Sequence, residues 1–403
     1  MRQFGAISSG MPWKKSEPMD QRIEFGLKAL RTDNFRALCA EYGISPKTGY
    51  KWRQRLERWG TEGLAEQSRR PRSHADQLSP EVVCEMVRLK QLHPYWGPRK
   101  IRALYQRLHG AAASESSFKR MLARAGLTEP RPRRRRAAEA GRLWSERRGQ
   151  APNEVWTVDF KGWWYDPARQ RCEPLTVRDE HSRYILELRR LPNARTETVR
   201  LCFERLFERY GLPGAIRSDN GAPFAQAQAL FGLSRLSVWW LALGIDLERG
   251  RPGHPQDNGG HERMHRDIGR ELEPRTAEQA ALDLWRAEFN HERPHEALGM
   301  KCPAEVYQRS ARAYPGTPVD LAYPGMYGRR VDKHGKVDWQ GAEITISGSL
   351  RGWSVGLQPT AEGKVEVWFG RLLLGWLDRS TESFQRAASR PLEAGQSQSQ
   401  QVM

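Results

Sequence analysis

Cysteine is scarce in this chain, and long apolar runs are missing. The 403 residues include five cysteines, odd in number and widely spaced, with no C-x-x-C pair among them. This pattern argues against a disulfide framework and against a zinc cluster, and it fits a reducing cytosol. No apolar run approaches the ~20 residues of a membrane span. The N-terminus also lacks the long apolar stretch of a secretory signal.

Acidic residues are in the minority. The chain has 48 Asp and Glu against 66 Lys and Arg, which gives a formal net charge of +18. This excess predicts a polyanionic partner, because Lys and Arg that neutralise phosphates release condensed counterions. Solubility alone is the other explanation. With 38% hydrophobic and 28% charged residues, we expect a soluble protein of roughly two to four compact domains.

After a flexible stretch over residues 1–19, residues 20–75 carry the signals of a helix-turn-helix domain. Asn34 can cap one short helix. Gly43 permits a tight turn, and Ser45 can cap the next helix with Pro46 at its first position. Two capped helices joined by a tight turn are typical of DNA-binding modules.

The second of these helices has two unlike faces. Trp52, Leu56 and Trp59 are spaced to share one side, which we expect to be buried. The other side is polar and basic, as in a helix that enters the major groove. We predict DNA contacts for Lys47, Thr48, Lys51, Gln54, Arg55 and Arg58. A plain three-helix core with a solvated face is the alternative.

Residues 76–128 predict a second helix-turn-helix domain. One helix begins after Ser79, and another follows the Trp-Gly-Pro triplet. A third helix buries Phe118 and turns Lys119 and Arg120 outward, and we expect these two residues to contact DNA.

Residues 129–153 form a basic, proline-containing linker. Repulsion between like charges favours an extended segment that follows a phosphate backbone, although a targeting signal or a solvated tail has a similar composition. The predicted DNA contacts in this linker are Arg133, Arg134, Arg135 and Arg136.

From residue 154 the pattern changes to strands. Residues 154–314 give the order of three strands, helix, strand, helix, strand, helix, which predicts a ribonuclease-H-like α/β core whose first three strands are antiparallel. Residues 315–380 give short strands between glycine turns, which predict a small all-β barrel. Residues 381–403 are rich in Gln and Ser and predict a disordered tail. The fold class is therefore multidomain, with all-α modules, an α/β core and an all-β barrel.

Three acidic residues stand in unusual places within the predicted core. Asp159 lies near the middle of an apolar strand, where a carboxylate is costly unless it is paired or binds metal. Asp219 lies where a strand runs into a glycine turn. Glu262 begins a helix and faces away from its apolar stripe, with Arg266 on the same side as a predicted DNA contact. An ordinary turn aspartate and a solvated helix glutamate are the alternatives for the last two.

Together the three carboxylates suit a hard divalent cation. Oxygen ligands from three elements fit Mg²⁺ or Mn²⁺. Two such ions ~3.5–4 Å apart activate the attacking hydroxyl and stabilise the leaving oxygen in phosphoryl transfer. Asp246, Glu248 and Asp257 are nearby competitors for the third position.

Four stretches carry a family resemblance, and they are VWTVDF, IRSDNGAPF, HPQDNGGHERMHR and FNHERPHEALGMKCPAEVY. In this order they resemble the insertion-sequence transposases of the DDE class, which share the catalytic core of retroviral integrases. The resemblance implies that Asp159, Asp219 and Glu262 bind the metal ions, two per site, and that the last stretch supports the core by packing. The interval from Asp219 to Glu262 is longer than is common in the family, with the excess between Ala225 and Trp240.

The resemblance also implies a function. The enzyme would bind the terminal inverted repeats of a mobile element, cut their 3′ ends and join them to target DNA. It would work as an oligomer on double-stranded DNA in the bacterial cytosol, nucleoid-associated when bound to DNA and away from any membrane. A catalytically silent regulator derived from a transposase and a structure-selective nuclease of similar fold are the alternatives.

Basic residues in the predicted barrel and several tryptophans give two further expectations. Arg329, Arg330, Lys333 and Lys336 predict that the barrel contacts DNA non-specifically or helps assembly. Most of the 15 tryptophans are expected in cores. A role in stacking on an unpaired end base stays open for one of them, and the candidates are Trp163, Trp164, Trp239 and Trp240.

The first recognition helix gives a direct test. Gln54→Ala should relax base preference by ~1–3 kcal/mol, because a good bidentate base contact is lost. Arg58→Ala should weaken binding to all DNA alike and lower the salt slope. Binding isotherms on repeat and random duplexes at several salt concentrations check both, and wild-type behaviour of both variants would contradict the assignment.

Overall fold

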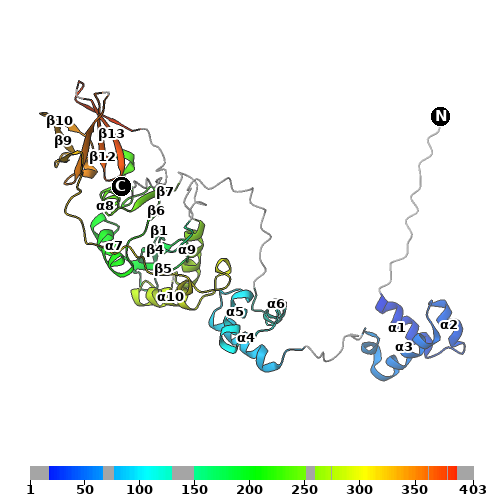
Figure 1. Cartoon of the computed structure of the whole chain (residues 1–403). Helices are drawn as coiled ribbons and strands as arrows, with labels where there is room; N and C mark the ends of the chain where they lie inside the picture. The colour runs from blue at the N-terminus through cyan, green and yellow to red at the C-terminus, as the bar shows by residue number, and fades with distance from the viewer. Residues whose placement is uncertain are drawn as a thin grey trace, which may run out of the picture. The chain divides into compact units, whose positions relative to one another are not determined.

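The computed structural model describes residues 18–66, 77–128, 149–250, 259–273, 275–361, 363–378 and 380–387. The chain divides into two compact units, residues 1–77 and residues 78–403 (Figure 1). No helix of the described residues is long and apolar enough to cross a bilayer.

The first unit is a three-helix module. It contains α1 (Pro18–Ala29), α2 (Phe35–Glu41), α3 (Pro46–Trp59) and the short η1 (Gly60–Leu64). The Asn34 side chain accepts a hydrogen bond from the Ala37 amide at 3.1 Å, and the Ser45 hydroxyl accepts one from the Thr48 amide at 3.2 Å. The predicted caps and the turn at Gly43, whose φ is +62°, are thus confirmed.

The predicted burial of Trp59 is wrong. Trp52 and Leu56 are buried as expected, but Trp59 is 54% exposed. The chain turns at Gly60 directly after Trp59, and η1 brings Leu64 into the core with no exposed surface. Leu64 therefore occupies the place that helical spacing assigned to Trp59.

The second unit begins with another three-helix module, made of α4 (Pro80–Leu92), α5 (Pro98–His109) and α6 (Glu115–Arg124). Ser79 caps α4 and Ser114 caps α6. Its small core is apolar, with Met86, Ile101 and Phe118 at its centre.

The α/β core, predicted over residues 154–314, has a five-stranded sheet in the order β5-β4-β1-β6-β7. Its strands are β1 (Val155–Phe160), β4 (Pro174–Asp179), β5 (Ile185–Arg190), β6 (Ala215–Ser218) and β7 (Asp246–Arg249). The first three pair antiparallel, while β6 and β7 run parallel to β1. A two-stranded hairpin, β2 (Trp164–Tyr165) with β3 (Arg171–Cys172), is inserted between β1 and β4. The predicted ribonuclease-H-like topology is confirmed.

Helices cover both faces of this sheet. On one face, α7 (Thr196–Tyr210) and α8 (Arg235–Ala242) form a large aromatic core with β1. Trp239 and Trp240 lie inside this core, with 1% and 0% of their surface exposed. The short η2 (Leu230–Gly232) before α8 packs against the apolar cluster of the C-terminal region instead. On the other face, α9 (Gly259–Glu271) and α10 (Gln279–His291) pack on β5 and on the β2–β3 hairpin. The short turns η4 (Glu296–Leu298) and η5 (Pro303–Glu305) follow α10.

The C-terminal region is all-β, but it is not a closed barrel. The strands are β8 (Tyr327–Arg330), β9 (Lys336–Trp339), β10 (Ala342–Thr345), β11 (Ser354–Pro359), β12 (Val365–Phe369), β13 (Leu372–Asp378) and β14 (Ser383–Arg386), with η6 (Gly348–Leu350) before β11. Five of them pair in the order β14-β13-β12-β11-β8, and β9 pairs only with β10. The edge strands β8 and β14 do not meet, because the β9–β10 hairpin packs its apolar side against the sheet instead of joining its edges.

The open sheet extends further along the chain than the sequence predicts. β14 pairs with β13 through Arg386, within the stretch from residue 381 that was expected to be a disordered tail. Phe384 from this strand packs against the apolar cluster of the sheet, which gives the pairing a reason.

The C-terminal sheet shares its apolar cluster with the core. Leu233 and Val238, from the segment that leads into and through α8, are buried together with Val355, Leu357 and Val367 of the sheet. The longer interval between Asp219 and Glu262 therefore supplies a surface on which the sheet packs.

The second helical module contacts the end of the core. Arg107 of α5 donates to the Met300 carbonyl oxygen at 2.9 Å and pairs with Glu305 at 2.6 Å. Arg99 pairs with Glu296 at 3.3 Å. The stretch around η4 and η5 thus packs against the module as well as against the core.

Arg293 is a buried cation shared by several elements. Only 2% of its surface is exposed, and its guanidinium pairs with Asp267 at 3.0 Å and with Glu271, both on α9. The same group lies 5.7 Å from the Trp96 ring of the second module and 5.6 Å from the Trp285 ring of α10. Arg293 belongs to the stretch FNHERPHEALGMKCPAEVY, and these contacts explain how that stretch supports the core by packing.

We predict that Arg293→Leu lowers the free energy of unfolding of the second unit by about 3–5 kcal/mol, because two carboxylates lose a buried partner. Arg88→Leu, which breaks the exposed pair with Glu85 on α4, should cost less than ~1 kcal/mol. Urea titrations of both variants measure the difference. Equal small losses would show that the buried pair contributes little.

Candidate active site

A buried histidine fastens α9 to the sheet. His261 has no exposed surface. Its Nδ1 lies 2.8 Å from the Thr157 hydroxyl of β1, and its Nε2 lies 2.6 Å from the Thr176 hydroxyl of β4. His265, one turn later, places Nε2 2.8 Å from the same Thr176 hydroxyl. The start of α9 is therefore held over the strand that carries Asp159.

Both imidazoles are neutral at physiological pH. Burial lowers the pKa of His261 well below its usual range and lowers the pKa of His265 to about 3. Sequence reasoning missed His261. The signal that could have found it is the spacing of four residues between two histidines on a helix, which puts both on one face.

The three predicted carboxylates lie near enough to one another to interact electrostatically. Asp159 is the last but one residue of β1, not mid-strand as expected, and Asp219 directly follows the parallel neighbour β6. Glu262 lies in the first turn of α9 and is exposed. The ends of two parallel strands and the start of one helix thus meet at one edge of the sheet.

The electrostatics of Asp159 report this proximity. The pKa of Asp159 is raised to about 7: burial is the largest cause, the carboxylates of Asp219 and Glu262 add to it, and a hydrogen bond from the Phe160 amide opposes it. As they stand, no three His, Cys, Asp or Glu side chains in the described part of the chain are close enough together to hold a metal ion. The donors are hard oxygens and repel one another, so their chemistry fits a divalent cation.

Arg249 holds the turn that carries Asp219. Its guanidinium donates to the Ser218 hydroxyl, to the Asp219 carbonyl oxygen at 3.2 Å and to the Phe224 carbonyl oxygen at 2.7 Å. Gly221 gives the Asp219 carboxylate room, since a Cβ at this position would lie 2.9 Å from its Oδ2. Sequence reasoning missed Arg249, because its partners, the Ser218 hydroxyl and two backbone carbonyl oxygens, lie far away in sequence.

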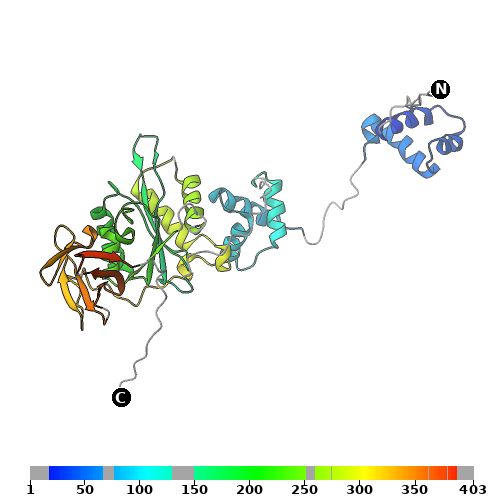
Figure 2. The ribbon, with the colours of Figure 1, turned by 90° about the horizontal axis from the view of Figure 1, so that it is seen from above.

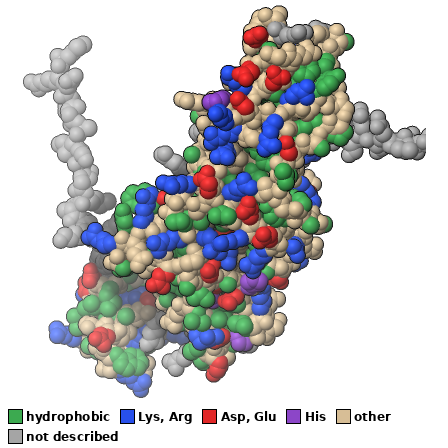
Figure 3. Space-filling model, turned by 90° about the vertical axis from the view of Figure 1, so that its left-hand side faces the viewer, with side chains coloured by type: hydrophobic (Ala, Val, Ile, Leu, Met, Phe, Trp, Pro, Cys, Tyr) green, Lys and Arg blue, Asp and Glu red, His purple; other side chains and the backbone are tan. Residues whose placement is uncertain are grey.

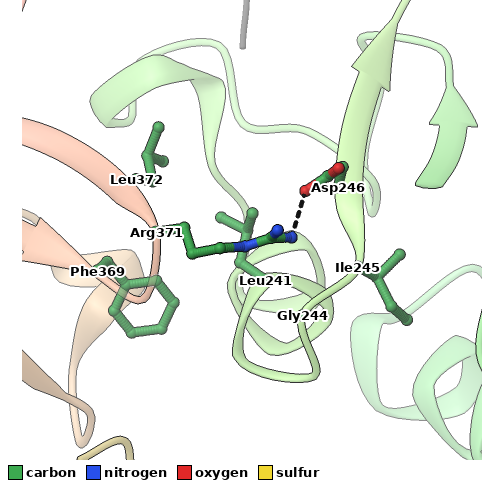
Figure 4. A pocket seen from close by; sticks show the side chains of 7 residues that line it. All are labelled: Leu241, Gly244, Ile245, Asp246, Phe369, Arg371 and Leu372. Carbon is green, nitrogen blue, oxygen red and sulfur yellow. Dashed lines mark hydrogen bonds and ion pairs between the residues drawn. The ribbon is translucent and has the colours of Figure 1, made fainter. Parts of the chain in front are cut away.

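Two of the competing carboxylates have other partners. Glu248 pairs with the buried Arg217 at 2.7 Å. Asp246 pairs with Arg371 of the C-terminal sheet at 2.9 Å, beside a small pocket between α8, β7 and the β12–β13 turn (Figure 4). Asp257 lies outside the described residues. The contacts therefore favour Glu262 as the third member of the site.

The predicted DNA-contacting side chains of α3 fall into two groups. Lys47, Lys51, Gln54 and Arg58 are exposed. Thr48 and Arg55 are half-buried. The Thr48 hydroxyl contacts the Ser45 cap at 3.0 Å, and the Arg55 guanidinium lies 5.3 Å from the Trp52 ring.

In the second unit, Lys119 and Arg120 are exposed on α6, and Arg266 is exposed on α9. Lys and Arg side chains are spread over the face shown in Figure 3, interspersed with acidic ones. The predicted contacts of the basic linker, Arg133, Arg134, Arg135 and Arg136, lie outside the described residues.

Comparisons with known families cover most of the chain. Residues 149–255 and residues 243–303 each match an integrase core domain family. Residues 21–72 match a helix-turn-helix domain family, and residues 48–122 match a homeodomain-like domain family. Residues 326–385 match the C-terminal domain of IS481 family transposases.

Individual relatives agree with these matches. The 31.7 kDa protein of insertion element IS407 from Burkholderia multivorans is 27% identical over 236 residues, which cover 57% of this chain and 82% of that protein. The 39.2 kDa protein of insertion element IS476 from Xanthomonas euvesicatoria is 27% identical over 278 residues, which cover 66% and 76%. The solved HTLV-2 integrase catalytic core domain in complex with magnesium aligns with a TM-score of 0.31 at 14% identity, over 40% of this chain and 100% of that one.

The integrase core matches and the strand order define the class of protein, which is a polynucleotidyl transferase core of the integrase type. The helix-turn-helix matches and the insertion-element relatives, taken with the integrase core, support an insertion-sequence transposase of the DDE type. Residues 326–385 are similar to the C-terminal domain of IS481 family transposases.

Asp159 gives a test that does not depend on activity. Its carboxyl is an acid whose pKa is raised on folding to about 7. Its contribution to stability is therefore fully present below the ordinary aspartate range and is lost as the pH rises from about 4 to about 7. At pH 8 with EDTA, Asp159→Asn should unfold at a higher temperature than the wild type.

Mg²⁺ should reverse this order by stabilising the wild type by about 1–3 kcal/mol, through binding to the folded state alone, with no effect on Asp159→Asn. Thermal unfolding in EDTA measures the effect of the substitution, and thermal unfolding in Mg²⁺ measures the stabilisation by the ion. Asp246→Asn serves as the matched control. An equal Mg²⁺ response in all three proteins would place the ion elsewhere.

Proposed function

We propose that this transposase cuts the 3′ ends of its element by metal-dependent hydrolysis and then joins the freed 3′ hydroxyls to target DNA. The observation that carries the proposal is that Asp219 and Glu262 lie near enough to Asp159 to add, after burial as the largest cause, to the rise of the Asp159 pKa to about 7. Three like charges held together in a folded protein call for a cation that the reaction can use.

The three carboxylates would hold Mg²⁺ or Mn²⁺, with two ions per site. When bound, such ions supply a metal-activated attacking oxygen and stabilise the leaving oxygen of the phosphodiester. The chain itself contributes position. His261 and His265 set Glu262 over β1, and Arg249 sets the turn of Asp219.

The basic residues would bring DNA to this edge. Lys47, Lys51, Gln54 and Arg58 on α3 would contact the terminal inverted repeats, together with Lys119 and Arg120 on α6. Arg266, exposed one turn after Glu262, would contact a phosphate next to the cut. Two DNA ends must be joined to one target, so we propose an oligomer assembled on DNA in the bacterial cytosol.

The test replaces Glu262 with Gln, which keeps the size of the side chain and removes its charge. Binding to repeat DNA should survive, while cleavage and joining in Mg²⁺ should fall by on the order of 10²–10³-fold or more. Asp246→Asn is the matched control, since Asp246 is paired with Arg371 away from the site. Glu248→Gln is less suitable because it removes a partner of the buried Arg217.

Gel assays on a labelled repeat end separate the outcomes. If Glu262→Gln stays active while Asp246→Asn is inactive, the assignment of Glu262 as the third metal ligand is wrong. A wild type that binds the repeat but never cuts it, with Mg²⁺ or Mn²⁺, would favour the catalytically silent regulator. Cleavage without any joined product would favour a nuclease.

A further inference from the structure

The β2–β3 hairpin begins only a few residues after Asp159. In Figure 2 it stands out from the body of the core. Its base is fixed by Trp164, which is 3% exposed and donates its indole N–H to the Thr276 carbonyl oxygen at 2.9 Å. Cys172, the partner of Trp164 across the hairpin, is also buried in this cluster.

The residues on either side of Trp164 point the other way. Trp163 is 57% exposed and Tyr165 is 51% exposed. Their ring centroids lie 5.5 Å apart at an interplanar angle of 69°, so the two rings meet edge to face. The Arg171 guanidinium, which also pairs with Glu173, lies 5.4 Å from the Trp163 ring centroid. We call Trp163, Tyr165 and Arg171 the hairpin platform.

The hairpin platform lies close to Asp159 along the chain. Trp163 follows Asp159 by four residues, so their Cα atoms are at most about 14 Å apart. Nucleotides along one strand of a duplex are spaced by ~3.4 Å, and this distance therefore spans about four of them. Lys161, between the two, pairs with Glu273 at 3.0 Å and keeps the connecting segment against the end of α9.

The size and the charge of the hairpin platform indicate what kind of group binds it. Two rings offer far less than the ~800 Å² that each partner of a stable protein interface covers. Two aromatic faces beside a guanidinium suit a flat, electron-rich ring attached to a phosphate chain. Of the four tryptophans for which stacking was left open, Trp164, Trp239 and Trp240 are buried, and Trp163 alone has an open face.

We propose that the hairpin platform stacks an unpaired base at the DNA end next to the cut. This proposal rests on the proposed function, since it assigns the base a place beside the scissile phosphate. Stacking would hold the end of the duplex open, so that the phosphate can approach the carboxylates without the neighbouring strand in the way.

The experiment compares fully paired repeat ends with ends whose terminal bases are mismatched, using the full-length protein. Trp163→Ala should slow cleavage of paired ends by about 5- to 150-fold, which corresponds to ~1–3 kcal/mol for one stacked base. On mismatched ends, the deficit should shrink to within about threefold, because the opening is already made. Trp163→Phe should restore most of the rate on paired ends, and Leu201→Ala, an equally exposed truncation on α7, should match the wild type.

A binding measurement keeps this test independent of catalysis. A 2-aminopurine at the terminal position should be quenched on binding by the wild type in Ca²⁺, and not by Trp163→Ala. If the wild type cuts neither DNA, the proposed function fails, while the quenching still decides on the platform. Equal deficits on both DNAs, unchanged quenching in Trp163→Ala, or a loss of self-association in that variant with quenching intact would each overturn the proposal.

Discussion

The candidate site depends on how one helix is fixed to a sheet. Asp159 comes from β1 and Asp219 from the turn after β6, but Glu262 comes from α9, and repulsion between like charges opposes the approach of that helix. His261 opposes this by using both ring nitrogens, one toward Thr157 of β1 and one toward Thr176 of β4. Because burial keeps the imidazole neutral, the attachment adds no charge beside the carboxylates.

The other end of α9 is fixed by different chemistry. Arg293 pairs with Asp267 and Glu271 there, and its guanidinium also faces the rings of Trp96 and Trp285. A charged anchor is tolerable at that end because it lies at the opposite end of the helix from Glu262. The helix is therefore held by neutral hydrogen bonds near the candidate carboxylates and by ion pairs away from them.

Much of the fold could be predicted because its signals are local. The caps at Asn34 and Ser45, the apolar stripe of α9 and the alternation along β1 each lie within one element. What the sequence could not show depends on distant partners. Leu64, after the turn at Gly60, is buried where Trp59 was expected, and the β9–β10 hairpin forms a sheet of its own instead of closing a barrel. The three carboxylates were predicted from their local context, whereas His261 and Arg249 act on residues far away in sequence.

The extra length before Glu262 has a consequence for how such proteins can change. Leu233 and Val238 of that segment are buried against the C-terminal sheet, whose cluster would be open to water without them. Neither piece can be lost alone without exposing an apolar surface that favours aggregation. The insertion and the C-terminal sheet should therefore be inherited as a pair, so that a relative with a short interval is expected to lack this sheet or to pack it elsewhere.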